Sequence, residues 1–226
     1  MKLSVIIPVF NENKTMHRIL EIIRSVPVEK EIIVVDDGST DGTRDILKSQ
    51  PQDGKVRVIL HERNQGKGSA VRTGIREAKG DAIIIQDADL EYDPMDYPLL
   101  LDAMRKTDAD VVYGSRFLGK KKVTSFWHRL VNGFLTVLTN ILFGSHLTDM
   151  ETCYKLFRSS LLKDIPLRST GFEIEVELTV KTLKKGAKIV EVPISYKGRS
   201  FHEGKKIGWR DGVKAVVSLL KYRLFS

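Results

Sequence analysis

The sequence has few of the residues that build disulfide or zinc frameworks. Its 226 residues include one cysteine, Cys153, so no internal disulfide can form, and a reducing compartment is compatible without being required. The five histidines stand apart, without the spacing of zinc ligands. Each histidine is therefore better interpreted as a surface or core residue than as a metal ligand.

Long apolar segments and several common ligand motifs are missing as well. The first apolar run, residues 3–8, is too short for a signal peptide, and no stretch is long and apolar enough to span a bilayer. Neither G-x-x-x-x-G-K-[ST] nor G-x-S-x-G occurs, and residues 66–71 break the G-x-G-x-x-G pattern at Val71. No recognisable nucleic-acid-binding module is present, so we expect no nucleic-acid partner.

The composition is that of a globular protein with an anionic partner. An apolar fraction of 42% is enough for a core, and the length suits a single domain over residues 1–226. The formal net charge of +8 favours a polyanionic partner: a phosphate-bearing ligand, nucleic acid or an anionic membrane surface. The absence of a nucleic-acid module leaves the first and the third.

The first half of the chain alternates short apolar runs with helical segments. Runs of strand length, rich in β-branched residues, cover residues 3–8, 31–35, 56–60, 83–86 and 111–115. The alternation predicts an α/β fold, with a Rossmann-like, mostly parallel sheet and helices on both faces.

The second half of the chain is different. Residues 127–143 are apolar almost all round, which is typical of either a buried helix or a membrane-facing one. A helix is expected over residues 173–184 and a strand over residues 189–195. Residues 209–224 have the pattern of a basic amphipathic C-terminal helix.

An acidic loop directly follows the run at residues 83–86. It carries Asp87, Asp89 and Glu91, two positions apart, at the strand end where open α/β sheets bind ligands. This spacing can bring two or three oxygen ligands to one hard divalent cation, with substrate phosphates and water completing the shell. The alternative is a solvated turn.

Two other strand ends carry loops of similar character, at residues 8–12 and 36–41. In an α/β sheet these ends can converge with the acidic loop on one crevice. Asp37 can accept hydrogen bonds from a base N–H or a ribose hydroxyl, and Lys67 adds a positive charge. Together these features indicate a nucleotide diphosphate bound through a metal.

These loops form a set of motifs in order along the chain. They are PVFNE at 8–12, VDDGS at 35–39, NQGKG at 64–68, QDADL at 86–90 and GSRF at 114–117, with further matches at 148–149, 196–199 and 203–207. Each is weakly specific alone, but together they resemble the family 2 inverting glycosyltransferases with the GT-A fold. Within that family the chain is most similar to the dolichyl-phosphate mannose and glucose synthase group.

The resemblance implies a role for each matching residue. Residues 1–117 would bind the nucleotide sugar, and residues 118–226 would face the acceptor and the membrane. The donor-binding set is Pro8, Phe10, Glu12, Asp36, Asp37, Lys67, Asp87, Arg199 and Lys205. Mg²⁺ or Mn²⁺ would be held by Asp87, Asp89 and Glu91, and Asp89 would be catalytic. Arg116 and Arg129 would hold the acceptor's phosphate, because arginine suits bidentate phosphate contacts; the alternative for both is a surface salt bridge.

Two departures from the family pattern refine the prediction. The Q-x-x-R-W motif of processive polysaccharide synthases is absent, which argues against polymerisation. The C-terminal transmembrane helices of many polyprenyl-phosphate relatives are also missing. We therefore expect peripheral contact with the cytoplasmic face of a membrane through residues 127–143 and the basic C-terminal helix.

The predicted reaction moves one hexose from GDP-mannose or UDP-glucose to a polyprenyl (dolichyl-type) phosphate, with inversion. A phosphate monoester has its second pKa at about 6, so it is largely dianionic at neutral pH and attacks without a protein base. Asp149 and Glu173 are the obvious candidates should a base be needed.

Two alternatives remain at this point, and a third is disfavoured. A soluble transferase could act on a sugar or protein hydroxyl, and a non-catalytic protein could bind nucleotide sugars with the same fold. A sugar nucleotidyltransferase would need a glycine-rich N-terminal loop, which residues 8–12 do not provide. The donor base and the oligomeric state stay open.

Overall fold

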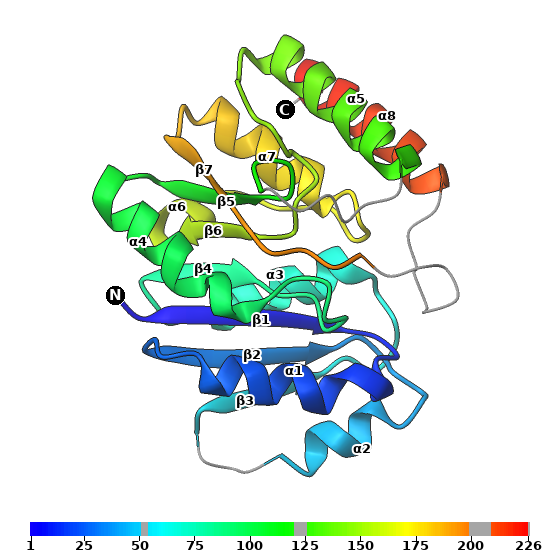
Figure 1. Cartoon of the computed structure of the whole chain (residues 1–226). Helices are drawn as coiled ribbons and strands as arrows, with labels where there is room; N and C mark the ends of the chain where they lie inside the picture. Colours follow the sequence, from blue (N-terminus) through cyan, green and yellow to red (C-terminus); the bar gives the residue numbers. More distant parts are fainter. Residues whose placement is uncertain (51–53, 120–125, 199–208, 226) are drawn as a thin grey trace.

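The fold is built on a mixed β-sheet that runs through both halves of the chain. The computed structural model describes residues 1–50, 54–119, 126–198 and 209–225. The strands of these residues are β1 (Leu3–Val9), β2 (Lys30–Asp36), β3 (Val56–Leu60), β4 (Ala82–Ile85), β5 (Val111–Ser115), β6 (Lys155–Arg158) and β7 (Ile189–Pro193). They form a seven-stranded sheet in the order β3-β2-β1-β4-β6-β5-β7 (Figure 1).

The sheet is mostly parallel, as the alternation of strands and helices predicts. The pairs β1–β2, β1–β4, β2–β3 and β5–β7 are parallel. Strand β6, however, runs antiparallel to both of its neighbours, β4 and β5. As a result, the residues that lead into β6 lie at the edge where β4 and β5 end. This reversal brings a segment of the second half of the chain to the predicted crevice.

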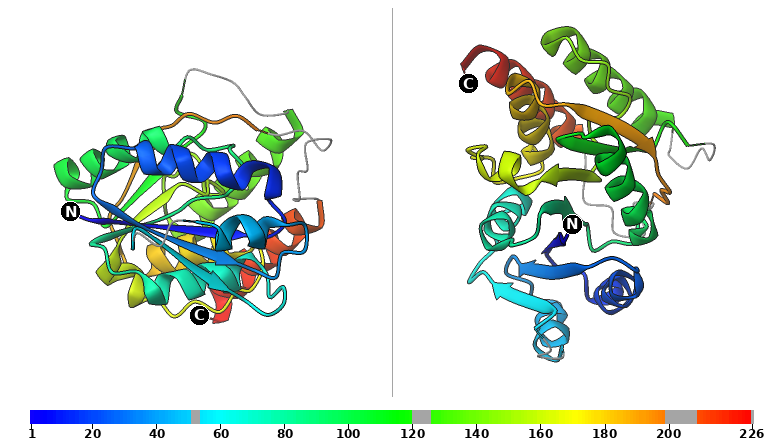
Figure 2. Two further views of the ribbon diagram at one scale, coloured as in Figure 1. Left: turned by 90° about the horizontal axis from the view of Figure 1, so that it is seen from below. Right: turned by 90° about the vertical axis from the view of Figure 1, so that its left-hand side faces the viewer.

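Helices cover both faces of the sheet, which confirms the predicted architecture (Figure 2). They are α1 (Asn13–Ser25), α2 (Thr43–Lys48), α3 (Lys67–Glu77), the 3-10 helix η1 (Pro94–Asp96), α4 (Tyr97–Thr107), α5 (Phe126–Phe143), α6 (Ser159–Lys163), α7 (Ile174–Lys184) and α8 (Trp209–Phe225). Residues of α1 and α4 share one apolar core with the sheet, and residues of α3 and α7 share another. Because successive strand residues point to opposite faces, Val5 and Ile7 of β1 enter the first core while Ile6 enters the second.

Helices α5 and α8 lie side by side over α7 (Figure 1). Their inner faces are anchored by Leu135 of α5 and by Ala215 and Leu219 of α8, all of which are buried. The opposite faces carry exposed apolar side chains, among them Phe134 and Ile141 of α5 and Val217 and Leu224 of α8. In the part of the chain described by the structure, no helix combines the length and the apolarity that crossing a bilayer requires.

Candidate active site

A cavity of about 300 Å³ opens at the carboxyl edge of β1, β2 and β4. The three strand-end loops expected to converge all contribute to its wall, as does the segment that leads into β6. Its lining includes Pro8, Phe10, Glu12, Asp37, Asn64, Gly66, Lys67, Asp87, Asp89, Glu91, Tyr92, Arg116, Asn132, Glu151, Cys153, Phe172 and Tyr196. Residues far apart in the sequence thus form one concave site.

One end of the cavity is formed by the loops after β1 and β2. Asp37 lies there almost fully buried, and its carboxylate accepts a hydrogen bond of 2.7 Å from the Gly66 amide. The amide of Gln65 donates to the same carboxylate at 3.0 Å, and Nδ1 of His61 lies 2.8 Å from its Oδ1. Asp37 therefore fixes the loop after β3 as well as facing the cavity.

Asp36, predicted beside Asp37 in the donor-binding set, is not part of the cavity wall. Its carboxylate is fully buried and accepts a hydrogen bond of 2.5 Å from Nε of Arg44 on α2. Adjacent residues at the end of a strand point to opposite faces, so Asp36 turns toward α2 while Asp37 turns toward the cavity. This placement corrects the prediction, because Asp36 supports the loop and does not line the site.

Lys67, at the start of α3, joins the acidic loop to the second half of the chain. Its Nζ lies 2.7 Å from Oδ1 of Asp87 and 3.4 Å from Oε1 of Glu175. Gly66 precedes it with φ +95°, and a Cβ there would come within 2.3 Å of the Thr170 carbonyl oxygen, so the tight approach requires glycine. Burial would lower the pKa of Lys67, but the carboxylates of Asp87 and Glu175 outweigh that effect and hold the pKa well above its usual value.

The acidic loop does not present three equivalent ligands. Leu90 has a φ of +63°, a left-handed conformation that is rare for a leucine. Beyond it, Oε2 of Glu91 accepts a hydrogen bond of 2.6 Å from the Tyr196 hydroxyl, while Oδ1 of Asp89 accepts one of 3.0 Å from the Glu91 amide. Among the residues that the structure describes, no three His, Cys, Asp or Glu side chains gather closely enough to hold a metal. Glu91 therefore points to Tyr196 in this structure, and its role as a third ligand stays a prediction.

Asp87 and Asp89 nevertheless have the right chemistry for a divalent cation. Both carboxylates line the same cavity. Mg²⁺ is commonly bound by one or two carboxylates, with water and substrate phosphates as its other ligands. Two carboxylates in the wall of one cavity match this pattern, so the residues fit a cation that binds together with its substrate.

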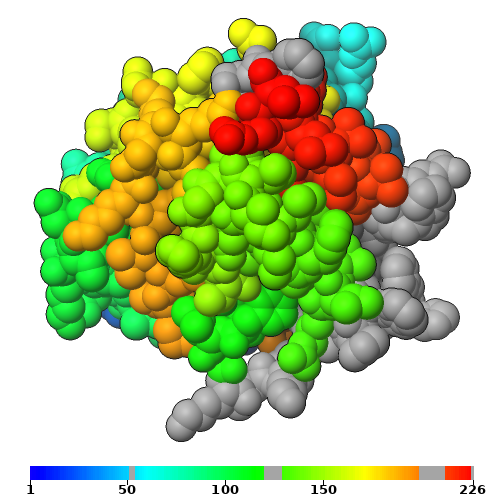
Figure 3. Space-filling model, turned by 90° about the horizontal axis from the view of Figure 1, so that it is seen from above, coloured from blue at the N-terminus to red at the C-terminus, as the bar shows by residue number. Residues whose placement is uncertain are grey.

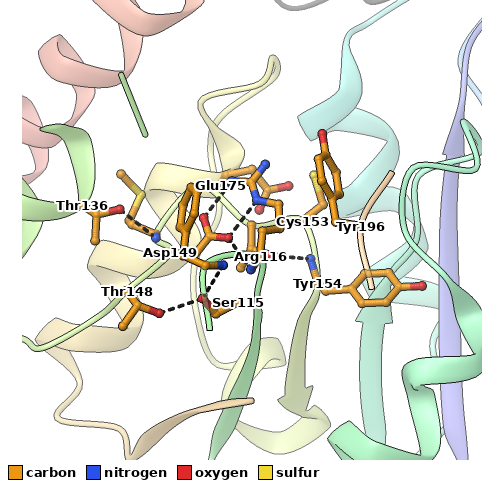
Figure 4. A network of polar contacts seen from close by, with 12 residues as sticks. Ser115, Arg116, Thr136, Thr148, Asp149, Cys153, Tyr154, Glu175 and Tyr196 are labelled. Carbon is orange, nitrogen blue, oxygen red and sulfur yellow. Dashed lines mark hydrogen bonds and ion pairs between the residues drawn. The ribbon is translucent and has the colours of Figure 1, made fainter. Parts of the chain in front are cut away.

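Arg116 and Asp149 form a buried ion pair at the other end of the cavity (Figure 4). Nε and Nη2 of Arg116 donate to the two carboxylate oxygens at 2.8 and 2.7 Å, and the Arg116 amide donates to Oδ2 at 2.9 Å. The Arg116 side chain is 9% exposed and that of Asp149 is 0% exposed, so the alternative of a surface salt bridge is wrong. The guanidinium also lies over the Tyr196 ring, 5.3 Å from its centroid.

Two further predicted residues, Arg129 and Glu173, do not line the cavity. Arg129 is exposed on α5, and the cavity lining does not include it. Glu173 also lies outside the lining, where its Oε1 accepts from the Gly171 amide at 3.1 Å. Arg199 and Lys205 lie outside the described residues.

Glu151 is a cavity residue that the sequence analysis did not identify. It precedes β6 and lines the cavity, yet its Oε1 is shielded from solvent and has no hydrogen-bond partner among the described residues. Burial raises the pKa of Glu151 to about 7, against the opposing attraction of Lys155 and Arg116. Its only signal in the sequence is an acid two residues after Asp149.

Solved structures with the same fold were found among nucleotide-bound proteins. Glucosyl-3-phosphoglycerate synthase from Mycobacterium tuberculosis, in complex with Mn²⁺, uridine diphosphate and phosphoglyceric acid, matches with a TM-score of 0.77 and 19% identity, covering 100% of this chain and 79% of that one. TarS from S. aureus, in complex with UDP-GlcNAc, matches with a TM-score of 0.67 and 20% identity, covering 100% and 67%. The fold is therefore GT-A, as predicted.

The sequence profile described as Glycosyl transferase family 2 matches residues 4–166. The chain belongs to glycosyl transferase family 2. Undecaprenyl-phosphate mannosyltransferase of Micrococcus luteus is 32% identical, over 99% of this chain and 95% of that protein. Dolichol-phosphate mannosyltransferase of Pyrococcus furiosus is 31% identical, over 99% of this chain and 64% of that protein. The resemblance drawn from the motifs is confirmed.

Proposed function

We propose that this glycosyltransferase moves one hexosyl group from a nucleotide diphosphate sugar to a polyprenyl phosphate, with inversion at the anomeric carbon. The names of the M. luteus and P. furiosus relatives support a polyprenyl phosphate acceptor. The observation that carries the proposal is the position of α5, which lines the cavity through Asn132 and exposes an apolar face to the surroundings. A lipid-linked acceptor must reach the cavity while its chain stays in an apolar phase, and α5 borders both places.

The exposed face consists of two stripes with the same spacing. They are Leu130, Phe134, Val137 and Ile141 on α5, and Val213, Val217, Leu220 and Leu224 on α8. Positions i, i+4, i+7 and i+11 share one side of a helix, and the two helices form one adjoining surface (Figure 3). We call this surface the α5–α8 face.

The α5–α8 face suits the interface of an anionic membrane. Exposed apolar surface of this extent is unusual for a side of a protein that meets only water. Exposed basic residues accompany it, with Arg129 on α5 and Lys214, Lys221 and Arg223 on α8. Amphipathic helices with basic flanks bind such membranes peripherally, through apolar burial and attraction to anionic lipid. We propose that residues 118–226 form the acceptor- and membrane-facing half, and residues 1–117 the donor-binding half.

On the donor side, one group of cavity residues binds the nucleoside and another binds the diphosphate. Pro8, Phe10, Glu12 and Asp37 hold the nucleoside. Asp87 and Asp89 would hold Mg²⁺ or Mn²⁺, and the ion would supply positive charge to the departing diphosphate. Lys67 keeps the Asp87 carboxylate in place and adds its own charge beside the phosphates. Mn²⁺ in the M. tuberculosis neighbour supports the choice of metal.

On the acceptor side, Arg116 holds the phosphate close to the anomeric carbon. Its pairing with Asp149 fixes the guanidinium in place and leaves Nη1 without a partner among the described residues. Neither Asp149 nor Glu173 is placed to act as a base, since the first is buried against Arg116 and the second lies outside the cavity lining. A dianionic phosphate needs no base.

One observation favours a second candidate, a transferase that acts on a hydroxyl. Such an enzyme needs a general base of nearly neutral pKa, and Glu151 lines the cavity with a pKa raised to about 7 by burial. This candidate predicts that alcohols are acceptors and that the α5–α8 face is dispensable.

The test uses the α5–α8 face itself. Phe134 is 59% exposed and Ile141 is 74% exposed, so replacing both by serine leaves the core intact. We expect the double variant to lose retention by anionic liposomes and transfer to polyprenyl phosphate embedded in them, while its transfer to a short, water-soluble prenyl phosphate is unchanged. Leu99→Ser, at a 41% exposed position on α4, is the matched control and should behave as wild type. Equal transfer by all three proteins to the embedded acceptor would refute the membrane-facing role.

A further inference from the structure

Glu151 has a buried carboxyl oxygen that lacks a hydrogen-bond donor in the part of the chain that the structure describes. Two cations attract its carboxylate, but both are engaged elsewhere: Lys155 contacts Glu175 at 2.7 Å, and Arg116 contacts Asp149 at 2.7 Å. Its Oε1 has no hydrogen-bond partner among the described residues. A buried polar atom without a partner usually costs stability. Such an arrangement in a cavity wall indicates a ligand that supplies the missing donors.

The order of the strands indicates which part of the nucleotide diphosphate sugar would lie next to Glu151. Along the cavity edge, Asp37 follows β2, Asp87 follows β4, and Glu151 precedes β6, which is the neighbour of β4. Neighbouring strands are about 4.8 Å apart, so Glu151 lies one strand beyond the diphosphate position, on the side away from the nucleoside. In a nucleotide diphosphate sugar, the group beyond the diphosphate is the sugar.

We infer that Glu151 binds hydroxyl groups of the donor hexose and thereby selects which hexose is transferred; this inference rests on the proposed function. A hexosyl group offers several O–H donors, which are the partners that a carboxylate without donors requires. Asn132 of α5 also lines the cavity and adds an amide that can both donate and accept.

The chemistry predicts selectivity in addition to affinity. A hydrogen bond to a charged group changes binding by roughly 10- to 100-fold. A site that pairs with a hydroxyl discriminates strongly against a sugar that lacks that hydroxyl or has it inverted, because the buried carboxylate is then left without a donor. We expect the preference of the enzyme between two epimeric donors to depend on Glu151.

The experiment compares Glu151→Gln and Glu151→Ala with wild type and with Asp102→Asn. Asp102 is an exposed carboxylate on α4 and serves as the control for removal of one negative charge. Calorimetry with Mn²⁺ measures the affinity for GDP, UDP, GDP-mannose and UDP-glucose. Steady-state transfer measures kcat/KM for donors that differ at one hydroxyl.

For both Glu151 variants we expect unchanged affinity for the nucleoside diphosphate that wild type prefers, about 10- to 100-fold weaker binding of the matching nucleotide sugar, and a smaller preference between epimeric donors. Unchanged sugar affinity and selectivity would overturn the inference. So would an equal loss for diphosphate and sugar, which indicates a structural role. A fall in kcat with intact binding would also overturn it and identify Glu151 as a base. Failure of wild type to bind any of the four ligands would instead refute the proposed function.

Discussion

The buried contact between Lys67 and Asp87 offers a sharp test of how the site is assembled. Lys67→Met removes the positive charge but keeps most of the apolar stem. The Lys67 side chain is 10% exposed and that of Asp87 is 19% exposed, so both charges are largely removed from water. Loss of one partner of a buried pair costs about 3–5 kcal/mol. We expect the lower end, because both side chains keep some solvent and Glu175 retains Lys155 as a partner at 2.7 Å.

A loss of about 3 kcal/mol lowers the Tm of a chain of this size by roughly 6–12 °C. Mn²⁺ should restore more of the Tm in the variant than it adds to wild type, because the ion can neutralise Asp87 without competing with the lysine. The assay is thermal unfolding with and without Mn²⁺. Lys106→Met is the control, since it breaks a pair with Asp102 that is largely exposed and worth at most about 1 kcal/mol. A Lys67→Met protein that melts with wild type, or that gains no more from Mn²⁺, would refute the reasoning.

Three further predictions address the metal, the acceptor and the pH dependence of stability. Asp89→Ala should abolish transfer and metal-dependent donor binding without unfolding the protein; full wild-type activity in EDTA would contradict the role of the metal. Arg116→Lys keeps a charge beside Asp149 but loses the bidentate geometry, so the KM for polyprenyl phosphate should rise while donor affinity, measured by calorimetry, stays within about twofold. The pKa of Glu151 is raised from 4.5 to about 7, so the folded state holds its proton more tightly and loses stability as pH rises between these values. Glu151→Gln should therefore gain up to about 3 kcal/mol relative to wild type between pH 5 and pH 8, and a constant difference in unfolding free energy would exclude this titration.

The sheet and the strand-end loops could be predicted from the sequence because their signals are local. A short β-branched run ending in polar residues locates a strand and its ligand-binding end, and this was enough to bring Asp37, Asp87 and Asp89 to one cavity. The same reasoning placed Asp36 in the donor-binding set, although side chains alternate along a strand and only Asp37 faces the cavity.

Other parts of the site depend on features that no local pattern encodes. Strand β6 is short, and no local pattern indicates that it pairs antiparallel with both β4 and β5. That direction puts Glu151 and Cys153 in the cavity wall. The pairing of Arg116 with Asp149, 33 positions away, and the capture of Glu91 by Tyr196, 105 positions away, likewise depend on tertiary packing. The left-handed backbone conformation of Leu90 could not be predicted from its residue type, because leucine rarely adopts it.

The most direct test of the account compares two acceptors that differ only in the attacking group. Wild-type protein with Mn²⁺ and either GDP-mannose or UDP-glucose is given a short polyprenyl phosphate or the matching polyprenol, and product is measured for each. The account predicts transfer to the phosphate and none to the alcohol, because the cavity offers Arg116 to hold a dianion and uses no base. Efficient glycosylation of the polyprenol would contradict it and would establish the enzyme as a transferase to hydroxyl groups.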